Sequence, residues 1–415
     1  MCGMEKKERD FREGKLPLPV GKSDWEEVAG HCYCVDKTLL MRDLLATRAG
    51  VALFTRPRRF GKTTAMQMLK CFFEKRGADE PDVRHLFESR AIAKCDHADE
   101  WMSHQGKYPV IYLTFKDHKA LTWEEAYERL AIDIGNEFKR HAACVESLPT
   151  GKDREDFVDI CERRASPARL GESLGFLARA LHVHSRVQPI VLIDEYDMPV
   201  TTASTNGYYT EMVAFMRAFL PSALKDNNHV KMGVMTGVIC PIKDTSLNGF
   251  IGGANYSIFD ERYSTCFGFT AEEVRDLLVA YGHPEKFDEV REWYGGCLCG
   301  NVEIFNPESI VKYVRNGFQP RSYLERTLVD AVCSTMTDSA AKSLRKVADH
   351  GGAYVCYNRH PSYMGIRTRE SDTFTWLVHS GLLAVRGENG NDYGRVIFPN
   401  REVESLWRAA LEAWS

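Results

Sequence analysis

Four apolar runs, separated by mainly helical stretches, predict the strands of one sheet. They cover residues 51–54, 108–115, 189–193 and 230–238. The third run is apolar without interruption, which is typical of a strand buried on both faces of a parallel sheet. Repeated alternation of strands and helices predicts a parallel α/β sheet with right-handed crossovers.

A basic turn with the sequence TRPRRFGKTT follows the first run, at residues 55–64. Gly61 lets backbone N–H groups approach phosphate oxygens, Lys62 reaches the β- and γ-phosphates, and the Thr63 hydroxyl can ligate Mg²⁺. The helix that follows points its positive end at the same anion. Arg56 stands where the usual pattern has its first glycine. The alternative is a strand, a basic turn and a helix start that bind no ligand.

Two adjacent carboxylates, Asp194 and Glu195, end the third run. Carboxylates at the end of a buried strand are costly unless a cation lies beside them. Near a phosphate-binding loop that cation is Mg²⁺, held through Asp194 by way of water, while Glu195 points the other way and polarises the attacking water. Thr236, near the end of the fourth run, can place a hydroxyl beside the γ-phosphate. The alternatives are carboxylates that end a strand at the surface and an ordinary strand threonine.

Together these motifs predict a Mg²⁺-dependent ATP site in a P-loop NTPase fold. Its predicted catalytic residues are Lys62 and Glu195, and its predicted metal-binding residues are Thr63 and Asp194. The predicted nucleotide-binding residues are Arg56, Pro57, Arg58, Arg59, Phe60, Gly61, Lys62, Thr63, Thr64 and Thr236. Arg58 and Arg59 have two possible interpretations. Both are solvated charges of the loop, or one of them uses its planar guanidinium to neutralise phosphate charge or to tether the loop to a carboxylate. Arg59 is the preferred candidate for that role.

Composition and charge limit the class of protein. The 415 residues suffice for two to three domains. A net charge of -4 with a sequence pI ≈ 6.4 argues against nucleic acid as the main partner. The charged N-terminal segment 1–15 lacks an apolar stretch, so it predicts a disordered tail and no secretory signal. No run approaches the roughly 18 to 20 apolar residues of a membrane span.

The 13 cysteines contain no CxxC pair, and without an export signal they favour a reducing, cytoplasmic location. Two CxC pairs exist, Cys32/Cys34 and Cys297/Cys299. Their spacing is not that of the usual structural zinc sites, so small buried hydrophobes are the preferred role and zinc stays an alternative.

Further segments resemble the AAA-ATPase-like family, whose members are relatives of the STAND-type signalling ATPases. The most specific are RPRRFGKT in the loop and DEYD at residues 194–197, and the resemblance covers about residues 16–320. It extends through residues 18–21, 25, 33–38, 108–111, 236–237, 267–270, 273–274, 293–296 and 305–307. Since the family's loop also has arginine in this place, the resemblance implies that Arg56 is a family trait. It implies ATP and Mg²⁺ as cofactors.

The chain departs from the family pattern at two places. Tyr294-Gly295-Gly296-Cys297 stands where the family often has YDGY, and Glu308 stands where it often has tryptophan. Many relatives also carry a PD-(D/E)XK nuclease-like domain after the ATPase. Only a few residues follow Pro399-Asn400, so we expect no such nuclease and another output.

Helical patterns follow the core. Thr270 and Glu273 predict a capping box, a second helix is expected at 285–293, and a third starts at Asn306-Pro307. This unit, 266–320, is either a lid over the nucleotide or an appendage that completes the core. The charged segment 141–167 is expected to be an insertion between core strands.

The last part of the chain has the outline of a winged helix: a helix at 373–379, a strand at 381–385, a turn at 387–394 and a strand at 395–398. In STAND-type ATPases such an element usually serves interaction and autoinhibition. The arginines that bear on DNA binding are Arg367, Arg369, Arg386 and Arg395, and this density is modest.

The predicted domains are a tail at 1–15, the P-loop ATPase core at 16–265, the helical lid at 266–320 and a winged-helix-like domain at 321–415. The predicted function is a Mg²⁺-dependent, ATP-hydrolysing switch that controls a protein partner or self-assembly. Two alternatives remain, an ATP-binding scaffold with little turnover and a nucleic-acid-binding module. The sequence does not reveal the input signal, the partner or the oligomeric state.

Overall fold

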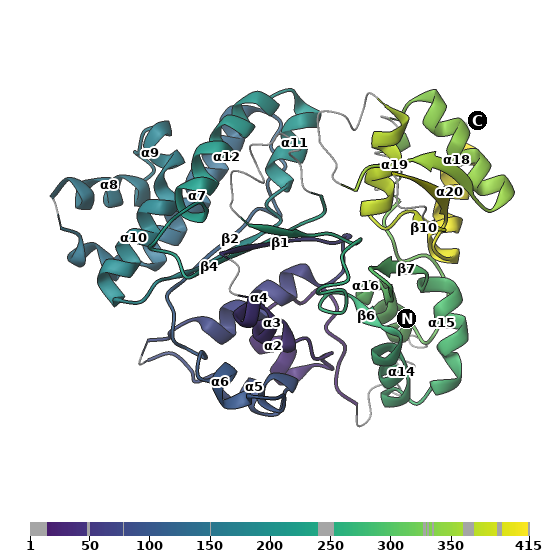
Figure 1. Cartoon of the computed structure of the whole chain (residues 1–415), viewed down its shortest axis with the longest axis horizontal. Helices are drawn as coiled ribbons and strands as arrows, with labels where there is room; N and C mark the ends of the chain where they lie inside the picture. The colour runs from purple at the N-terminus through teal and green to yellow at the C-terminus, as the bar shows by residue number, and fades with distance from the viewer. Residues whose placement is uncertain are drawn as a thin grey trace, which may run out of the picture. The chain divides into compact units, whose positions relative to one another are not determined.

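The computed structural model shows a mixed α/β protein (Figure 1). It describes residues 15–47, 50–77, 79–149, 151–239, 253–326, 329, 332–333, 336–359, 369–387 and 392–413. The chain forms two compact units: unit 1 consists of Met1–Lys37, Arg56–Thr64 and Ser257–Ser415, and unit 2 of Thr38–Thr55 and Ala65–Tyr256. Nearly all of the predicted N-terminal tail lies outside the described residues.

Unit 2 contains a five-stranded parallel sheet in the order β2-β3-β4-β1-β5. Its strands are β1 (Val51–Thr55), β2 (Val110–Thr114), β3 (Ile190–Asp194), β4 (Met232–Gly237) and β5 (Ala254–Tyr256). Every residue of β1, β3 and β4 is buried, as expected for strands covered on both faces. The four predicted strands and their parallel pairing are confirmed. The short strand β5 was not predicted, because its three residues form no apolar run.

Helices cover both faces of this sheet; Figure 1 shows α11 and α12 on one side and α3 and α4 on the other. The helical elements are α3 (Leu39–Thr47), α4 (Lys62–Phe73, its first turn within unit 1), α5 (His85–Glu88), η1 (Ala91–Ala93), α6 (Ala98–Met102), α7 (Trp123–Arg140), η2 (Ala142–Ser147), α8 (Gly151–Cys161), α9 (Pro167–Gly171), α10 (Ser173–Ser185), α11 (Met198–Asn206) and α12 (Tyr209–Leu224). The segment expected to be an insertion thus contains η2 and α8. Phe157 of α8 is buried against Phe138 of α7, with ring centroids 4.9 Å apart.

The first described element of unit 1 is α2 (Trp25–His31), and unit 1 also contains a helical group around a small antiparallel sheet in the order β6-β8-β7. Its elements are β6 (Phe269–Thr270), α14 (Ala271–Ala280), η3 (Pro284–Lys286), α15 (Phe287–Tyr294), β7 (Cys297–Cys299), β8 (Val302–Phe305) and α16 (Pro307–Arg315). The predicted capping box is present: the Glu273 N–H donates to Thr270 Oγ1, and the Thr270 N–H donates to Glu273 Oε2. The three predicted helices are confirmed. The small sheet was not predicted, because its strands are too short to show a pattern.

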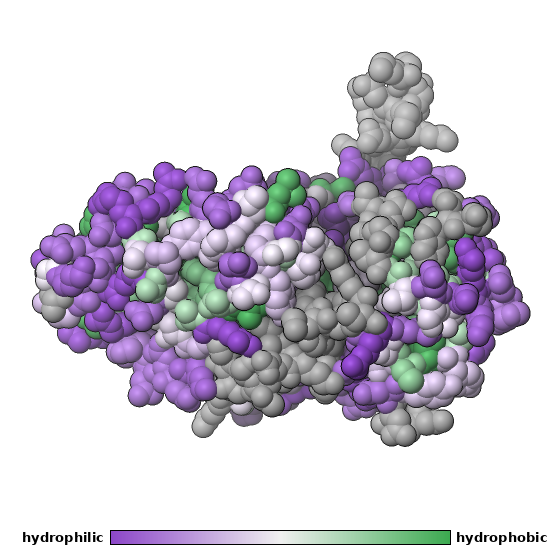
Figure 2. Space-filling view, turned by 90° about the horizontal axis from the view of Figure 1, so that it is seen from above, coloured by the Kyte–Doolittle hydropathy of each residue, from purple (hydrophilic) through white to green (hydrophobic). Residues whose placement is uncertain are grey.

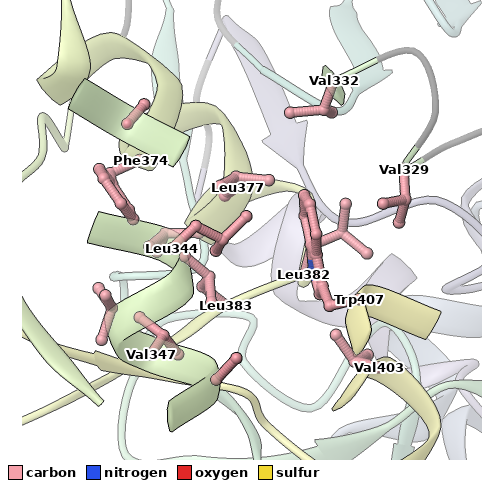
Figure 3. Packing of buried hydrophobic residues seen from close by; sticks show 14 of the residues in the cluster. Val329, Val332, Leu344, Val347, Phe374, Leu377, Leu382, Leu383, Val403 and Trp407 are labelled. Atoms are coloured by element: carbon pink, nitrogen blue, oxygen red, sulfur yellow. The ribbon is translucent and has the colours of Figure 1, made fainter. Parts of the chain in front are cut away.

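The C-terminal part of unit 1 packs three helices around a three-stranded antiparallel sheet in the order β10-β11-β9. Its elements are α18 (Asp338–His350), β9 (Ala353–Cys356), α19 (Glu370–His379), β10 (Ala384–Arg386), β11 (Tyr393–Ile397) and α20 (Arg401–Ala413). The order of helix and then hairpin is confirmed, and β9 adds a strand. Half of the predicted turn, residues 388–391, and Arg367 lie outside the described residues. Figure 3 shows Trp407 of α20 among Val403, Leu382 and Leu383, with its side chain buried.

Within the part of the chain that the structure describes, no helix combines the length and apolarity needed to cross a membrane. On the face shown in Figure 2, hydrophilic residues predominate among the coloured atoms, and hydrophobic residues occur in small groups. Scattered apolar residues of this kind are ordinary for a protein surface.

Candidate functional site

The basic turn connects β1, which ends at Thr55, to α4, which begins at Lys62. Two residues of this loop have backbones in the left-handed region, Arg59 with φ 68° and Gly61 with φ 78°. Glycine adopts this conformation without steric cost. A larger residue such as arginine seldom does so and is held there by the structure around it. The loop therefore has a defined, sharply bent backbone.

The Lys62 side chain is buried and lies across this bend. Its Nζ donates to the carbonyl oxygens of Arg56, at 3.1 Å, and Pro57, at 2.9 Å. These two bonds hold the ammonium group inside the loop. An ammonium group has three donor hydrogens and no acceptor, so its partners are acceptors such as carbonyl oxygens and anions.

Arg56 shows what the loop gains from arginine in place of its first glycine. Its side chain is 1% exposed, its Nη2 donates to the Tyr263 carbonyl at 3.2 Å, and its guanidinium lies 5.5 Å from the centre of the Phe267 ring. Burial lowers the pKa of this guanidinium. The side chain is thus directed into unit 1 and docks the loop there. The predicted contact of Arg56 with a nucleotide stays a prediction.

Phe60 docks the other end of the loop. Its ring packs in a cluster with Cys299 and Ile304, and its carbonyl accepts from the Gly268 N–H at 2.9 Å. Gly268 has φ +75°, and a Cβ there would lie 2.2 Å from the Ile304 side chain and 3.0 Å from the Phe60 ring. Only glycine fits this approach, which explains the glycine of the FGF segment at 267–269.

Arg59 connects the loop to two carboxylates of unit 1. Its Nε lies 3.0 Å from Glu308 Oε2, and its Nη2 lies 3.0 Å from Glu325 Oε1. The side chain is 54% exposed. This is a tether to carboxylates, one of the roles that the sequence left open for an arginine of the loop. Arg58 is also an exposed residue.

Three polar residues of unit 2 meet at the carboxyl end of adjacent strands. Asp194 of β3 is fully buried, and its Oδ1 accepts the Thr236 hydroxyl of β4 at 2.6 Å. Its Oδ2 accepts the Thr114 hydroxyl of β2 at 3.4 Å. The carboxyl ends of parallel strands form the usual ligand-binding edge of such sheets. Thr236, predicted to lie beside the γ-phosphate, here holds the carboxylate predicted to bind metal.

Glu195 lies just beyond β3 in a strained turn. Its φ is 51°, in the left-handed region, so the alternation of strand side chains does not continue through it. Its N–H donates to Thr236 Oγ1 at 3.4 Å, and the Tyr196 N–H donates to the Thr236 carbonyl at 3.0 Å. Strain of this kind at a candidate catalytic residue is consistent with a functional site.

Asp197 and Tyr196 fix this turn to the chain after β4. Asp197 is buried, and its Oδ2 accepts the N–H groups of Val238, at 2.9 Å, and Ile239, at 3.3 Å. The Tyr196 hydroxyl donates to the Ile239 carbonyl at 3.1 Å. The last two residues of the DEYD segment therefore have structural partners. Sequence reasoning missed this role, because the partners lie more than forty positions away.

The donor set can be tested against the Mg²⁺ that the motifs imply. Among the described residues, no three His, Cys, Asp or Glu side chains are grouped to hold a metal ion. Mg²⁺ typically takes one or two protein carboxylates and completes its shell with waters and phosphates. A buried carboxylate at Asp194 and a hydroxyl at Thr63 suit that chemistry. They do not suit a metal cage built from protein alone.

The two CxC pairs are not part of a metal cluster within the described residues. Cys297 and Cys299 lie on β7, and burial raises the pKa of Cys297 to about 12. Burial thus favours the neutral thiol of Cys297.

A cavity of ≈ 310 Å³ borders the docked side of the loop. Its walls are mostly apolar and include Phe60, Phe267, Ile304 and Leu383. Gly61, Lys62 and Thr63 are not among its lining residues. Of the predicted nucleotide-binding residues, the cavity thus borders Arg56, Pro57 and Phe60 but not the Gly61-Lys62-Thr63 turn.

Comparisons with known proteins match the first part of the chain. A family model described as "Predicted AAA-ATPase" matches residues 19–248, which include the loop, Asp194 and Thr236. The "Uncharacterized protein in vnfD 5'region" of Azotobacter chroococcum mcd 1 is 25% identical over 311 residues, 73% of this chain and 53% of that protein. This chain thus spans about half the length of the curated relative that it matches. No solved structure matches the chain.

Proposed function

The chain belongs to the predicted AAA-ATPase family, and we propose that it is a Mg²⁺-dependent ATPase switch with a P-loop fold. The order of the sheet carries this proposal. β4 lies between β1, from whose carboxyl end the loop leaves, and β3, which ends in Asp194. Thr236 at the end of β4 is bonded to Asp194. The phosphate-binding loop, the Thr236 hydroxyl and the Asp194 carboxylate thus follow or end three adjacent strands, at the edge where the strands have their carboxyl ends.

In this proposal each residue has one role. Lys62 donates to the β- and γ-phosphates, helped by the N–H groups at Gly61 and at the start of α4. Bound Mg²⁺ neutralises charge on the β- and γ-phosphates. Thr63 and Asp194 would hold the metal, and Glu195 orients the attacking water and accepts its proton. Pro57 to Phe60 follow the phosphates with their backbone, while Arg56 anchors the loop.

The proposed domains are the P-loop core at 16–265, a lid at 266–320 and a winged-helix-like domain at 321–415. Two separate apolar clusters support the division of the last two. One joins α14, α15 and α16, and the other joins α18, α19 and α20. A switch of the STAND type couples the nucleotide state to such a C-terminal element, and its output is a protein partner or self-assembly.

The alternative of a nucleic-acid-binding module gains no support from Arg386 and Arg395, two of the four arginines considered for it. Arg386 Nη2 donates to the Gly296 carbonyl at 2.9 Å, and Arg395 Nη2 donates to the Gly351 carbonyl at 3.0 Å. Both guanidinium groups thus bind backbone within unit 1. The scaffold alternative differs from the switch only in turnover, which depends on Glu195.

Binding of MgATP by calorimetry tests the proposal. Lys62→Ala should weaken binding by at least about tenfold, because a charge-assisted phosphate contact is lost. Lys70→Ala is the matched control, since Lys70 lies on the same helix and pairs with Glu74. Equal ATP affinity in wild type and Lys62→Ala would show that the loop is not a nucleotide site.

A further inference from the structure

The two carboxylates that hold Arg59 belong to segments that are themselves joined by a third carboxylate. Glu402 of α20 is 1% exposed. Its Oε2 accepts the Ser309 hydroxyl at 2.8 Å, with Oε1 at 3.1 Å, and Oε1 accepts the Tyr323 N–H at 2.7 Å. Ser309 follows Glu308 directly, and Tyr323 lies two residues before Glu325. Glu402 therefore fixes both segments that carry the partners of Arg59.

The helix that carries Glu402 is firmly seated. Trp407 is fully buried in the apolar cluster of Figure 3, and Val403 lies in the same cluster. At the start of α20, Asn400 Nδ2 donates to the Gly295 carbonyl at 2.7 Å, and Arg401 pairs with Glu292 at 2.6 Å. A movement of α20 therefore moves Glu402, and with it the segments at 309 and 323.

We propose that Glu308, Glu325 and Glu402 are positioning residues that connect the phosphate loop to α20 through Arg59. This inference rests on the proposed ATP site and adds its regulation. Glu308 and Glu325 occupy the guanidinium of Arg59, the loop arginine that the sequence prefers for a contact with phosphate or carboxylate. Displacement of α20 separates the two carboxylates and releases Arg59 toward the nucleotide. A change in the position of α20 thereby changes the affinity for ATP.

The charges decide the direction of this effect. A guanidinium can grip phosphate or carboxylate with two parallel bonds, so the two anions compete for it. Removal of the carboxylate charge leaves the full positive charge of Arg59 for the phosphates. The variants should therefore tighten ATP binding, whereas a loop that had merely lost support would bind ATP more weakly.

The first measurement is the rate of amide hydrogen exchange at residues 56–61 in the nucleotide-free protein. The double variant Glu308→Gln/Glu325→Gln, and Glu402→Ala alone, should each speed exchange in the loop about two- to fivefold, the equivalent of an exposed ion pair. Glu404→Gln is the control, because Glu404 lies on α20 but pairs with Arg408. Loop exchange equal to that of the control overturns the proposal.

The second measurement is the affinity for MgATP. The double variant and Glu402→Ala should bind MgATP about two- to fivefold more tightly than wild type, and the gain should vanish when Arg59→Ala is added. Weaker binding, or an equal gain without Arg59, contradicts the proposal. A third outcome separates this proposal from the proposed ATP site. If neither the wild type nor any variant binds ATP, but Glu402→Ala still speeds exchange in the loop, then the connection between α20 and the loop stands and the proposed ATP site fails.

Discussion

The Thr236 hydroxyl donates to the Asp194 carboxylate at 2.6 Å and so joins β4 to β3 at the carboxyl edge of the sheet. Both residues are fully buried. A buried carboxylate that loses a partner pays its desolvation cost, so Thr236→Val should lower the free energy of unfolding by about 1–3 kcal/mol. Thr236→Ser keeps the hydroxyl and should recover most of the loss. Urea denaturation measures both, and equal stability of the valine and serine variants would contradict this account.

Gly237 follows Thr236 where no side chain fits. A Cβ there would lie 2.7 Å from Asp197 Oδ1 and 2.8 Å from the Tyr196 ring. Gly237→Ala should therefore displace the turn that carries Glu195, lower stability by about 1–3 kcal/mol and reduce ATP turnover. Gly50→Ala is a suitable control, because a Cβ at Gly50 meets no atom within 4 Å. Normal ATP turnover in Gly237→Ala would show that the packing around Gly237 does not affect the catalytic site.

Removal of the anchor under the loop tests the role of Arg56. Arg56→Ala leaves a cavity beside Phe267 and frees the Tyr263 carbonyl, so it should lower the melting temperature and raise the KM for ATP. Arg58→Ala, on the exposed side of the loop, should change neither. Thermal denaturation and steady-state kinetics check both variants. If Arg56→Ala melts like wild type, the docking of the loop does not depend on this arginine.

Glu402 predicts a pH dependence of stability. Burial raises its pKa from 4.5 to about 7, which outweighs the hydrogen bonds from Tyr323 and Ser309. Because the folded state holds this proton more tightly than the unfolded state, its contribution is full below pH 4.5 and is lost as the pH rises through 7. At about 1.4 kcal/mol per pKa unit, the loss is on the order of 3 kcal/mol.

Lys312, Tyr294 and Cys297 interact electrostatically with Glu402. Lys312 favours the carboxylate, and burial raises the pKa of both Tyr294 and Cys297. Glu402→Gln should therefore flatten the decline of unfolding free energy between pH 5 and 8, as about 3 kcal/mol of pH dependence disappears. Urea denaturation across this range checks it. Parallel curves for wild type and Glu402→Gln would assign the pH dependence to other groups.

The sequence predicted those features that depend on neighbouring residues. The buried strands β1, β3 and β4 are apolar throughout, and the box at Thr270 and Glu273 spans three positions, so both have a local signal. The partners of the loop arginines could not be predicted in this way. Arg56 meets a carbonyl 207 positions away, and Arg59 meets Glu325 266 positions away. Such pairs form only when the fold brings distant segments together.

The phosphate loop shows the same limit within one motif. The pattern of Gly61 and Lys62 points to phosphate, but it does not show that Lys62 bonds to carbonyls across the loop. Asp197 likewise follows Asp194 and Glu195 as a third carboxylate. Only the structure shows that its role differs, because it accepts the N–H groups of Val238 and Ile239. Short strands such as β5 and β6 escape prediction because their pairing depends on neighbours in space.

The central claim, that this protein hydrolyses ATP with Glu195 as base, is tested most directly by single-turnover hydrolysis of MgATP. Wild type and Glu195→Gln should bind ATP equally well, while Glu195→Gln should hydrolyse it at least about a hundredfold more slowly, the scale of general-base effects. Glu146→Gln is the control, because it removes one negative charge from η2. Equal single-turnover rates in wild type and Glu195→Gln would contradict the account.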